Sequence, residues 1–172
     1  ENSLQLEYPE NKLNIVVCCD ASDDRTDEIV KGYNDQGVSL VRIEGRVGKT
    51  ECQNRVADLV DEDILVFSDA NSMYEPDAIS ELVSRFTSEV GCVVGELRYQ
   101  ESSDVEGESV YWRYESWIKR LESRFYSLVT GNGSIYAVKT DSYVPQPPDA
   151  ISDFTEPLSI VRTRGRVVYA PG

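Results

Sequence analysis

The sequence predicts an α/β fold, with a mostly parallel sheet that carries helices on both faces. Nearly continuous apolar runs of strand length are typical of strands buried on both faces, and they recur along the chain. They alternate with segments whose apolar residues recur every three or four positions, as in helices. With 172 residues, 40% of them hydrophobic, residues 1–172 can form a single domain with its own core.

Strands and helices are expected in turn along the chain. Strands are predicted over residues 13–19, 38–43, 64–67, 91–97, 135–138 and 167–169. Helices are predicted from Ser22 or Asp23 towards Gly37, after Thr50, after Pro76, over residues 110–128 and after Asp153. The fourth helix is expected to be amphipathic, with an apolar face made by Val110, Tyr114, Trp117, Leu121, Phe125 and Leu128.

The first strand ends in an acidic turn. Ser22, Asp23 and Asp24 are expected to cap the helix that follows, because their side chains can accept hydrogen bonds from its first amides. Asp20 lies before this cap, at the carboxyl end of the strand. There it can accept the N–H of a nucleobase or stabilise the turn, and position alone does not decide between the two.

The second helix follows a loop that contains Gly48 and Lys49. A glycine-containing loop with a lysine at a helix start suits a diphosphate group. It is not a P-loop, because the four-residue gap between two glycines before the lysine is missing. Thr50 and Gln53 have the spacing of a capping box at this helix start.

The central apolar run, Ile64 to Phe67, is followed by Asp69 and Asn71. In open α/β sheets, ligands bind at the carboxyl ends of the strands. Carboxylate and amide oxygens are hard ligands that suit Mg²⁺ or Mn²⁺ while the ion also holds phosphate. The alternative is a turn that Asp and Asn stabilise without binding a ligand.

Three later segments also carry candidate functional residues. The glycines of residues 131–133 permit close approach of the backbone. The prolines of residues 145–148 indicate an extended loop, expected to be a rim or a lid. Asp153 and Glu156 have the spacing of a helix cap, which is the structural alternative to a functional role for Asp153.

The composition limits the partners and the location. A net charge of −14 argues against a broad basic surface for nucleic acids, so an anionic nucleotide would need a local metal, a lysine or backbone amides. No apolar run is long enough to span a membrane. The four cysteines have no zinc-site spacing and no histidine to accompany them, so reduced thiols and a cytoplasmic location are expected.

The chain resembles the family 2 glycosyltransferases in five motifs that occur in order: Asp20 to Thr26, Gly48-Lys49 with Asn54, Phe67 to Asn71, Gly131 to Ser134, and Ser152-Asp153. The resemblance extends from about Tyr8 to the end of the sequence. The family includes cellulose, chitin and hyaluronan synthase-like members. It implies the Rossmann-like GT-A fold. It also implies inverting transfer of a sugar from a UDP-sugar to a hydroxyl of a sugar or lipid-linked acceptor, by an enzyme whose parent chain can be attached to the cytoplasmic face of a membrane.

The resemblance also implies roles for single residues. Asp20 would hold the uracil and Lys49 would lie beside the nucleotide. Asp69 and Asn71 would bind the metal ion, Mg²⁺ or Mn²⁺, and the diphosphate. Asp153 would act as the general base on the acceptor hydroxyl, and Gly131, Asn132 and Gly133 would lie near the acceptor. A metal ion at the leaving diphosphate and one base on the opposite side are consistent with direct displacement and inversion.

The sequence departs from the family pattern in several places. Asn71 replaces the second aspartate of the DxD element, and Ser152 replaces the acid that commonly precedes the base. The family's first strand and its late Gln-x-x-Arg-Trp element are missing. We therefore expect a catalytic-domain fragment, truncated at both ends and weakly active or inactive, whose open sheet edges could pair between chains.

Two other functions remain open. A non-catalytic module that binds nucleotide-sugars would also explain Asn71 and the missing strand. A Mg²⁺-dependent phosphatase-like domain is less well supported, because its nucleophilic aspartate normally ends the first strand, whereas Asp69 ends a later one.

Overall fold

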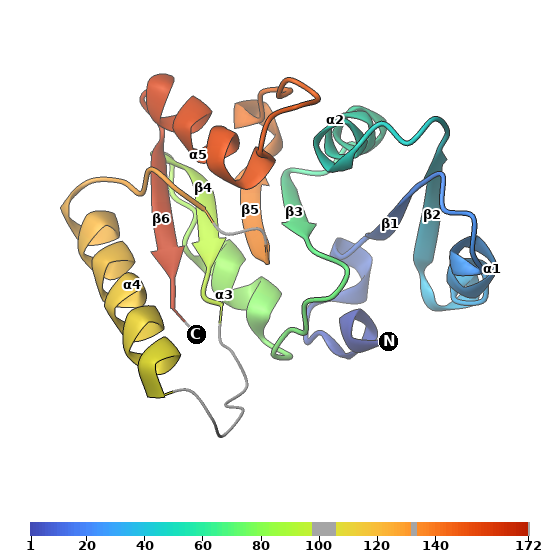
Figure 1. Ribbon diagram of the computed structural model, residues 1–172, viewed down its shortest axis with the longest axis horizontal. Coiled ribbons are helices and arrows are strands. Elements are labelled where there is room, and N and C mark those ends of the chain that lie inside the picture. Colours follow the sequence, from blue (N-terminus) through green and yellow to red (C-terminus); the bar gives the residue numbers. More distant parts are fainter. Residues whose placement is uncertain (98–105, 132–133, 172) are drawn as a thin grey trace.

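The computed structural model describes residues 1–97, 106–131 and 134–171 of the chain (Figure 1). Its strands are β1 (Ile15–Asp20), β2 (Val38–Ile43), β3 (Ile64–Ser68), β4 (Val90–Gly95), β5 (Ile135–Lys139) and β6 (Arg166–Ala170). Its α-helices are α1 (Thr26–Lys31), α2 (Lys49–Leu59), α3 (Ala78–Ser84), α4 (Glu106–Phe125) and α5 (Ser152–Arg162). The predicted strands and helices are therefore all present, with shifted ends.

The strands form two separate sheets. β1 and β2 pair in parallel, from Ile15 opposite Val38 to Asp20 opposite Ile43. The second sheet has the order β3-β5-β4-β6, in which β4 and β6 are parallel and β5 is antiparallel to both of its neighbours. Because β3, β4 and β6 share one direction, β5 is the only reversed strand of this sheet. The predicted mostly parallel arrangement is confirmed.

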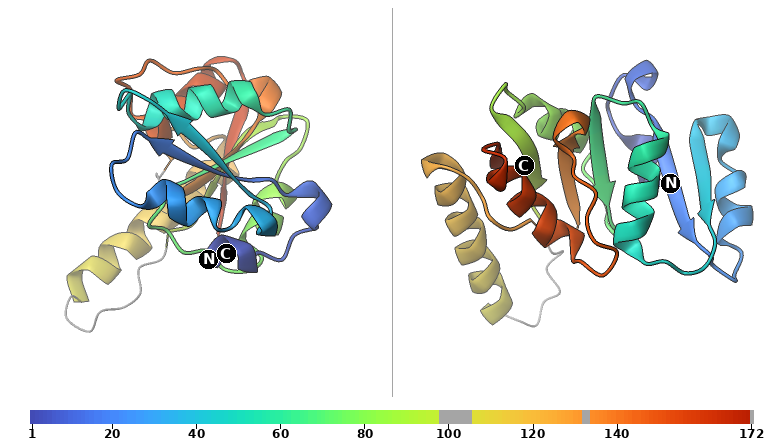
Figure 2. Two further views of the ribbon diagram at one scale, coloured as in Figure 1. Left: turned by 90° about the vertical axis from the view of Figure 1, so that its right-hand side faces the viewer. Right: turned by 90° about the horizontal axis from the view of Figure 1, so that it is seen from above.

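The two sheets meet across an unpaired boundary. In Figure 1 and in the right-hand view of Figure 2, β1 and β2 lie beyond β3, on the side away from β5. Within the described ranges, no strand pairing joins β1 to β3. Each of these two strands therefore has one edge without a hydrogen-bonded neighbour, as expected for a sheet that lacks a central strand.

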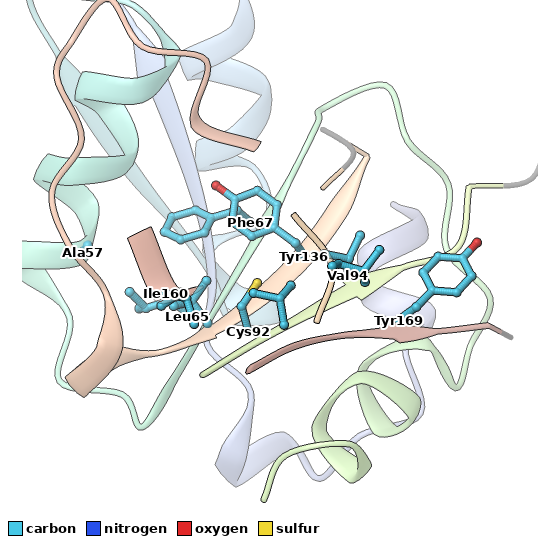
Figure 3. Packing of buried hydrophobic residues seen from close by; sticks show 11 residues of the cluster. Ala57, Leu65, Phe67, Cys92, Val94, Tyr136, Ile160 and Tyr169 are labelled. Carbon is cyan, nitrogen blue, oxygen red and sulfur yellow. The ribbon is translucent and has the colours of Figure 1, made fainter. Parts of the chain in front are cut away.

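Helices cover both faces of the larger sheet. On one face, side chains of β3, β4 and β5 pack against Ala57 of α2 and Ile160 of α5 (Figure 3). On the other face, Val93 of β4 and Ala137 of β5 pack against Leu82 of α3. Alternate residues of one strand thus belong to different cores, which explains the nearly continuous apolar runs.

The structure departs from three local predictions. α1 begins at Thr26, later than predicted, although the Asp24 carboxylate accepts the N–H of this first residue at 2.9 Å, the kind of bond expected of it. The capping box at Thr50 is not formed, since its hydroxyl donates instead to the carbonyl of Ala150. The predicted apolar face of α4 is only partly covered, since Tyr114, Trp117 and Phe125 are 58%, 56% and 85% exposed, whereas Leu121 is half-buried and Leu128, just after the helix, is buried.

The exposed aromatic side of α4 has a physical explanation. α4 is held against β6 by polar contacts, in which the Tyr169 N–H donates to the Ser123 hydroxyl and Arg166 donates to the Ser123 carbonyl. These contacts leave Tyr114 and Trp117 stacked on each other away from the core. In the part of the chain that the structure describes, no helix combines the length and apolarity needed to cross a bilayer.

Candidate active site

Asp20 binds the loop that precedes α2. Its two carboxylate oxygens accept the N–H groups of Val47 and Gly48, each at 2.8 Å. The Gly48 hydrogen bond, followed by that from Val47, lowers the pKa of Asp20, so the group is a carboxylate at neutral pH. Asp20 therefore fixes the backbone immediately before Lys49. Each oxygen keeps further acceptor capacity for a nucleobase N–H.

Lys49 and Asp69 form an ion pair. Lys49 is the first residue of α2, and its ammonium lies 2.6 Å from Asp69 Oδ1 at the carboxyl end of β3. The side chains are 45% and 36% exposed, so both are accessible to a ligand. The structure thus places a cation beside the carboxylate in the region that the sequence predicts for a diphosphate.

Asn71 lies in the turn after β3. The Ser72 N–H donates to the Asp69 carbonyl at 3.1 Å, which closes a turn around Asn71. The Asn71 side chain is exposed. Asp69 and Asn71 together give one carboxylate and one amide oxygen, and Lys49 already contacts one of the carboxylate oxygens.

This donor set fits a metal ion only in part. No group of three or more acidic, histidine or cysteine side chains that could hold a metal occurs among the described residues. A hard cation needs about six oxygen ligands. The residues present therefore fit an ion that arrives with a diphosphate and completes its shell with phosphate and water oxygens, rather than one held by protein alone.

Gly131 and Ser134, after α4, contact the segments that carry Asp153 and Asp69. The Asp69 N–H donates to the Ser134 carbonyl at 3.4 Å, and the Tyr74 hydroxyl donates to that carbonyl at 3.2 Å. The Gly131 N–H donates to the Asp153 carbonyl at 3.0 Å. Asn132 and Gly133, which the sequence also places near the acceptor, lie outside the described residues.

Asp153 lies in the first turn of α5 and is half-buried. No side-chain hydrogen bond caps this helix, so the predicted cap by Asp153 and Glu156 is wrong. The Thr50 hydroxyl donates to the Ala150 carbonyl at 2.7 Å and brings the start of α2 next to the segment before α5. The contacts thus connect Asp20, Lys49, Asp69, Gly131 and Asp153 around one region of the molecule.

Sequence reasoning missed a buried acid next to this region. Glu156 is completely buried, and burial raises its pKa to about 7 against weaker opposing hydrogen bonds from Val144 and Gln146. Gln146 is also buried, and its side chain connects the proline-containing loop to Glu156, a contact that is consistent with the predicted rim. The available signal in the sequence was that Glu156 lies among apolar residues of α5. Its cap spacing from Asp153 pointed instead to a position at the helix surface.

A family model described as "Glycosyl transferase family 2" matches residues 2–143. No curated protein shows a significant sequence match to the chain.

Solved structures resemble the chain over nearly its whole length. A mannosyltransferase, PcManGT from Pyrobaculum calidifontis, in complex with GDP-Man and Mn²⁺, has a TM-score of 0.80 and 21% identity over 99% of this chain and 49% of its own. TarS 1–349 of S. aureus in complex with UDP-GlcNAc has a TM-score of 0.69 and 14% identity, covering 99% of this chain and 53% of its own. These likenesses confirm the GT-A fold. The chain spans about half the length of either protein.

Proposed function

Because the chain belongs to glycosyl transferase family 2, we propose that it carries the donor site and the general base of an inverting, metal-dependent glycosyltransferase that uses a UDP-sugar. The proposed acceptor is a hydroxyl of a polysaccharide or glycolipid. Similar folds have been solved with GDP-Man and Mn²⁺ and with UDP-GlcNAc, which supports a nucleotide-sugar and a divalent ion. The choice of uracil and the acceptor class rest on the sequence resemblance.

Each proposed step has a residue in the site to perform it. Asp153 removes the proton from the acceptor hydroxyl, whose oxygen attacks C1 of the sugar while the bond from C1 to the diphosphate breaks. Lys49 stabilises the charge of the released nucleoside diphosphate, and Asp20 holds the loop before Lys49 and accepts the uracil N–H. When bound, a divalent ion at Asp69 and Asn71 would add Lewis-acid stabilisation of the diphosphate.

The observation that supports the proposal best is the contact between Lys49 and Asp69. These residues are far apart in the sequence and come from different elements, yet their charged groups are 2.6 Å apart. A diphosphate with its metal would replace this pairing, since the ammonium would move to the phosphates and the carboxylate to the ion. The site can therefore exchange an internal ion pair for a ligand without leaving either charge unpaired.

Calorimetry of UDP binding with and without Mn²⁺ tests the donor site in the wild type, Asp20→Ala and Asp69→Ala. We expect Mn²⁺ to strengthen UDP binding in the wild type and in Asp20→Ala, and to have no effect in Asp69→Ala. Asp20→Ala should weaken UDP about tenfold with or without Mn²⁺, because the loop before Lys49 loses its two anchors.

The exposed Asp61, after α2, provides a matched control, and Asp61→Ala should bind UDP like the wild type. An Mn²⁺ effect that survives in Asp69→Ala would refute the proposed metal site. Release of free sugar or transfer to an acceptor separates the enzyme from the alternative function: UDP binding with no turnover, in a version extended at both ends, would favour a non-catalytic binding module.

A further inference from the structure

A buried polar network lies between α2 and α5, outside the residues assigned to the reaction. Its members are Asn54 of α2, Gln146 of the loop before α5, and Glu156 of α5, which are 9%, 7% and 0% exposed. A buried polar side chain destabilises the folded protein unless it is hydrogen-bonded. The hydrogen-bond partners of these three side chains therefore show which segments they connect.

The Asn54 side chain hydrogen-bonds to both backbone groups of Gln146. Its amide nitrogen donates to the Gln146 carbonyl at 2.8 Å, and its amide oxygen accepts the Gln146 N–H at 3.0 Å. The Tyr143 hydroxyl donates to the same amide oxygen at 2.8 Å. Asn54 lies one and a half turns after Lys49 on the same helix, so the loop is attached to the element that carries the donor-side lysine.

Gln146 in turn attaches the loop to α5. Its side-chain nitrogen lies 3.0 Å from Glu156 Oε2, 3.1 Å from the Ser159 hydroxyl and 2.6 Å from the Val144 carbonyl. The other Glu156 oxygen accepts the Val144 N–H at 3.4 Å. Glu156 lies one turn after Asp153 on the same helix, so the chain of bonds ends on the element that carries the proposed base.

We propose that Asn54, Gln146 and Glu156 form a clamp that positions the first turn of α5, with Asp153, relative to the first turn of α2, with Lys49. These three are positioning residues, because among the described residues no hydrogen bond joins their side chains directly to Lys49, Asp69 or Asp153. The clamp works through rigid helices, in which a shift at Glu156 moves Asp153 one turn away. Its effect on transfer rests on the proposed function, but the mechanical link between the helices does not.

Hydrogen–deuterium exchange of the full chain tests the link without requiring turnover. Gln146→Met keeps the length and burial of the side chain and removes its amide. The substitution therefore breaks the hydrogen bond to Glu156 and leaves the hydrogen bonds between Asn54 and the backbone of residue 146 intact. We expect the amides of Phe154 and Thr155, which donate to the Ile151 carbonyl, to exchange about fivefold faster, with little change in α2. Asn54→Ser breaks the other end of the clamp and should loosen the loop at residues 144–146.

Ile160→Val is the matched control, since it removes one buried methyl group from α5 without touching the clamp. If Gln146→Met and Ile160→Val speed exchange equally at residues 151–155, the clamp is refuted. In an active, extended version, Gln146→Met should lower kcat about tenfold and leave the donor KM unchanged; a change in donor KM alone would also refute it. A wild type without turnover would refute the proposed function. The hydrogen–deuterium exchange rates would still show whether the clamp connects the two helices.

Discussion

At the scale of single residues, Gly131 is the position where a small change should separate donor binding from catalysis. A Cβ atom at this position would lie 2.5 Å from the Asp153 carbonyl oxygen, which is closer than atoms can approach. Gly131→Ala must therefore displace the turn or the first turn of α5. We expect a loss of about 1–3 kcal/mol in the free energy of unfolding, measured by urea denaturation.

The same substitution should slow transfer about 100-fold while UDP affinity stays within about twofold, because a shift of about 1 Å at a catalytic group is sufficient for such a loss. The donor side should move less than Asp153, because Asp69 is joined to this segment by a long backbone hydrogen bond, 3.4 Å to the Ser134 carbonyl. Gly32→Ala is the control: Gly32 has right-handed helical dihedral angles at the end of α1, and a Cβ there would lie 3.1 Å from the Ile29 carbonyl oxygen, away from the site. Equal losses of UDP binding and transfer in Gly131→Ala would contradict the assignment of this turn to the acceptor side.

The residue candidates could be chosen from the sequence, but their contacts could not. Asp20, Asp69 and Asp153 stood out because each follows a strand or opens a helix, positions that a single sequence reveals. That Lys49 pairs with Asp69, and that Asp20 accepts two backbone amides, depends on how separate elements pack. The burial of Glu156 was missed because the sequence shows only its cap spacing from Asp153, whereas burial depends on which face of α5 meets the sheet.

At the scale of elements, α5 should make the stability of the protein depend on pH near neutrality. Burial raises the pKa of Glu156 from its usual 4.5 to about 7. A group whose pKa is raised by folding stabilises the native state below its unfolded pKa, and this contribution is lost as the pH rises through the folded pKa. The stability contributed by Glu156 should therefore decline between about pH 4.5 and pH 7.

The groups that face Glu156 do not titrate in this window. Burial raises the pKa values of Cys92 on β4, Tyr136 on β5 and Tyr143 after β5, so all three remain neutral. Glu156→Gln removes the titration. We expect the difference in the free energy of unfolding, variant minus wild type, to rise by about 3 kcal/mol between pH 4.5 and pH 8. Urea denaturation at each pH measures this difference. Parallel pH profiles of the two proteins would show that Glu156 does not contribute to the pH dependence of stability in this range.

The elements themselves were predictable to different degrees. Strand positions followed from apolar runs such as Ile64 to Phe67, because burial on both faces leaves a continuous signal. The capping of α2 did not, since the Thr50 hydroxyl bonds to the Ala150 carbonyl, a partner distant in the sequence that a local capping rule ignores. The exposure of the aromatic side of α4 could not be predicted, because periodicity identifies an apolar face and not the neighbour that covers it.

At the scale of the whole molecule, the division into two sheets leaves β1 and β3 each with one edge that no other described strand pairs with. An unpaired strand edge exposes a row of backbone donors and acceptors that another chain can extend. A net charge of −14 opposes such pairing by repulsion between copies, and salt screens this repulsion within about 10 Å at 0.1 M. Self-association should therefore be weak at low salt and stronger at high salt.

Sedimentation velocity over a concentration series at about 0.05 M and about 0.5 M KCl measures this balance. We expect monomers at low salt and reversible dimers or larger species at high salt. Val16→Lys places a charge on the half-buried β1 and should suppress the association, because a lysine on an edge strand disfavours further pairing. Leu59→Lys adds the same charge at an exposed position of α2 and should not suppress it. If both lysines act equally, net charge and not the β1 edge controls association; a monomer under every condition would show that the edges do not pair between chains.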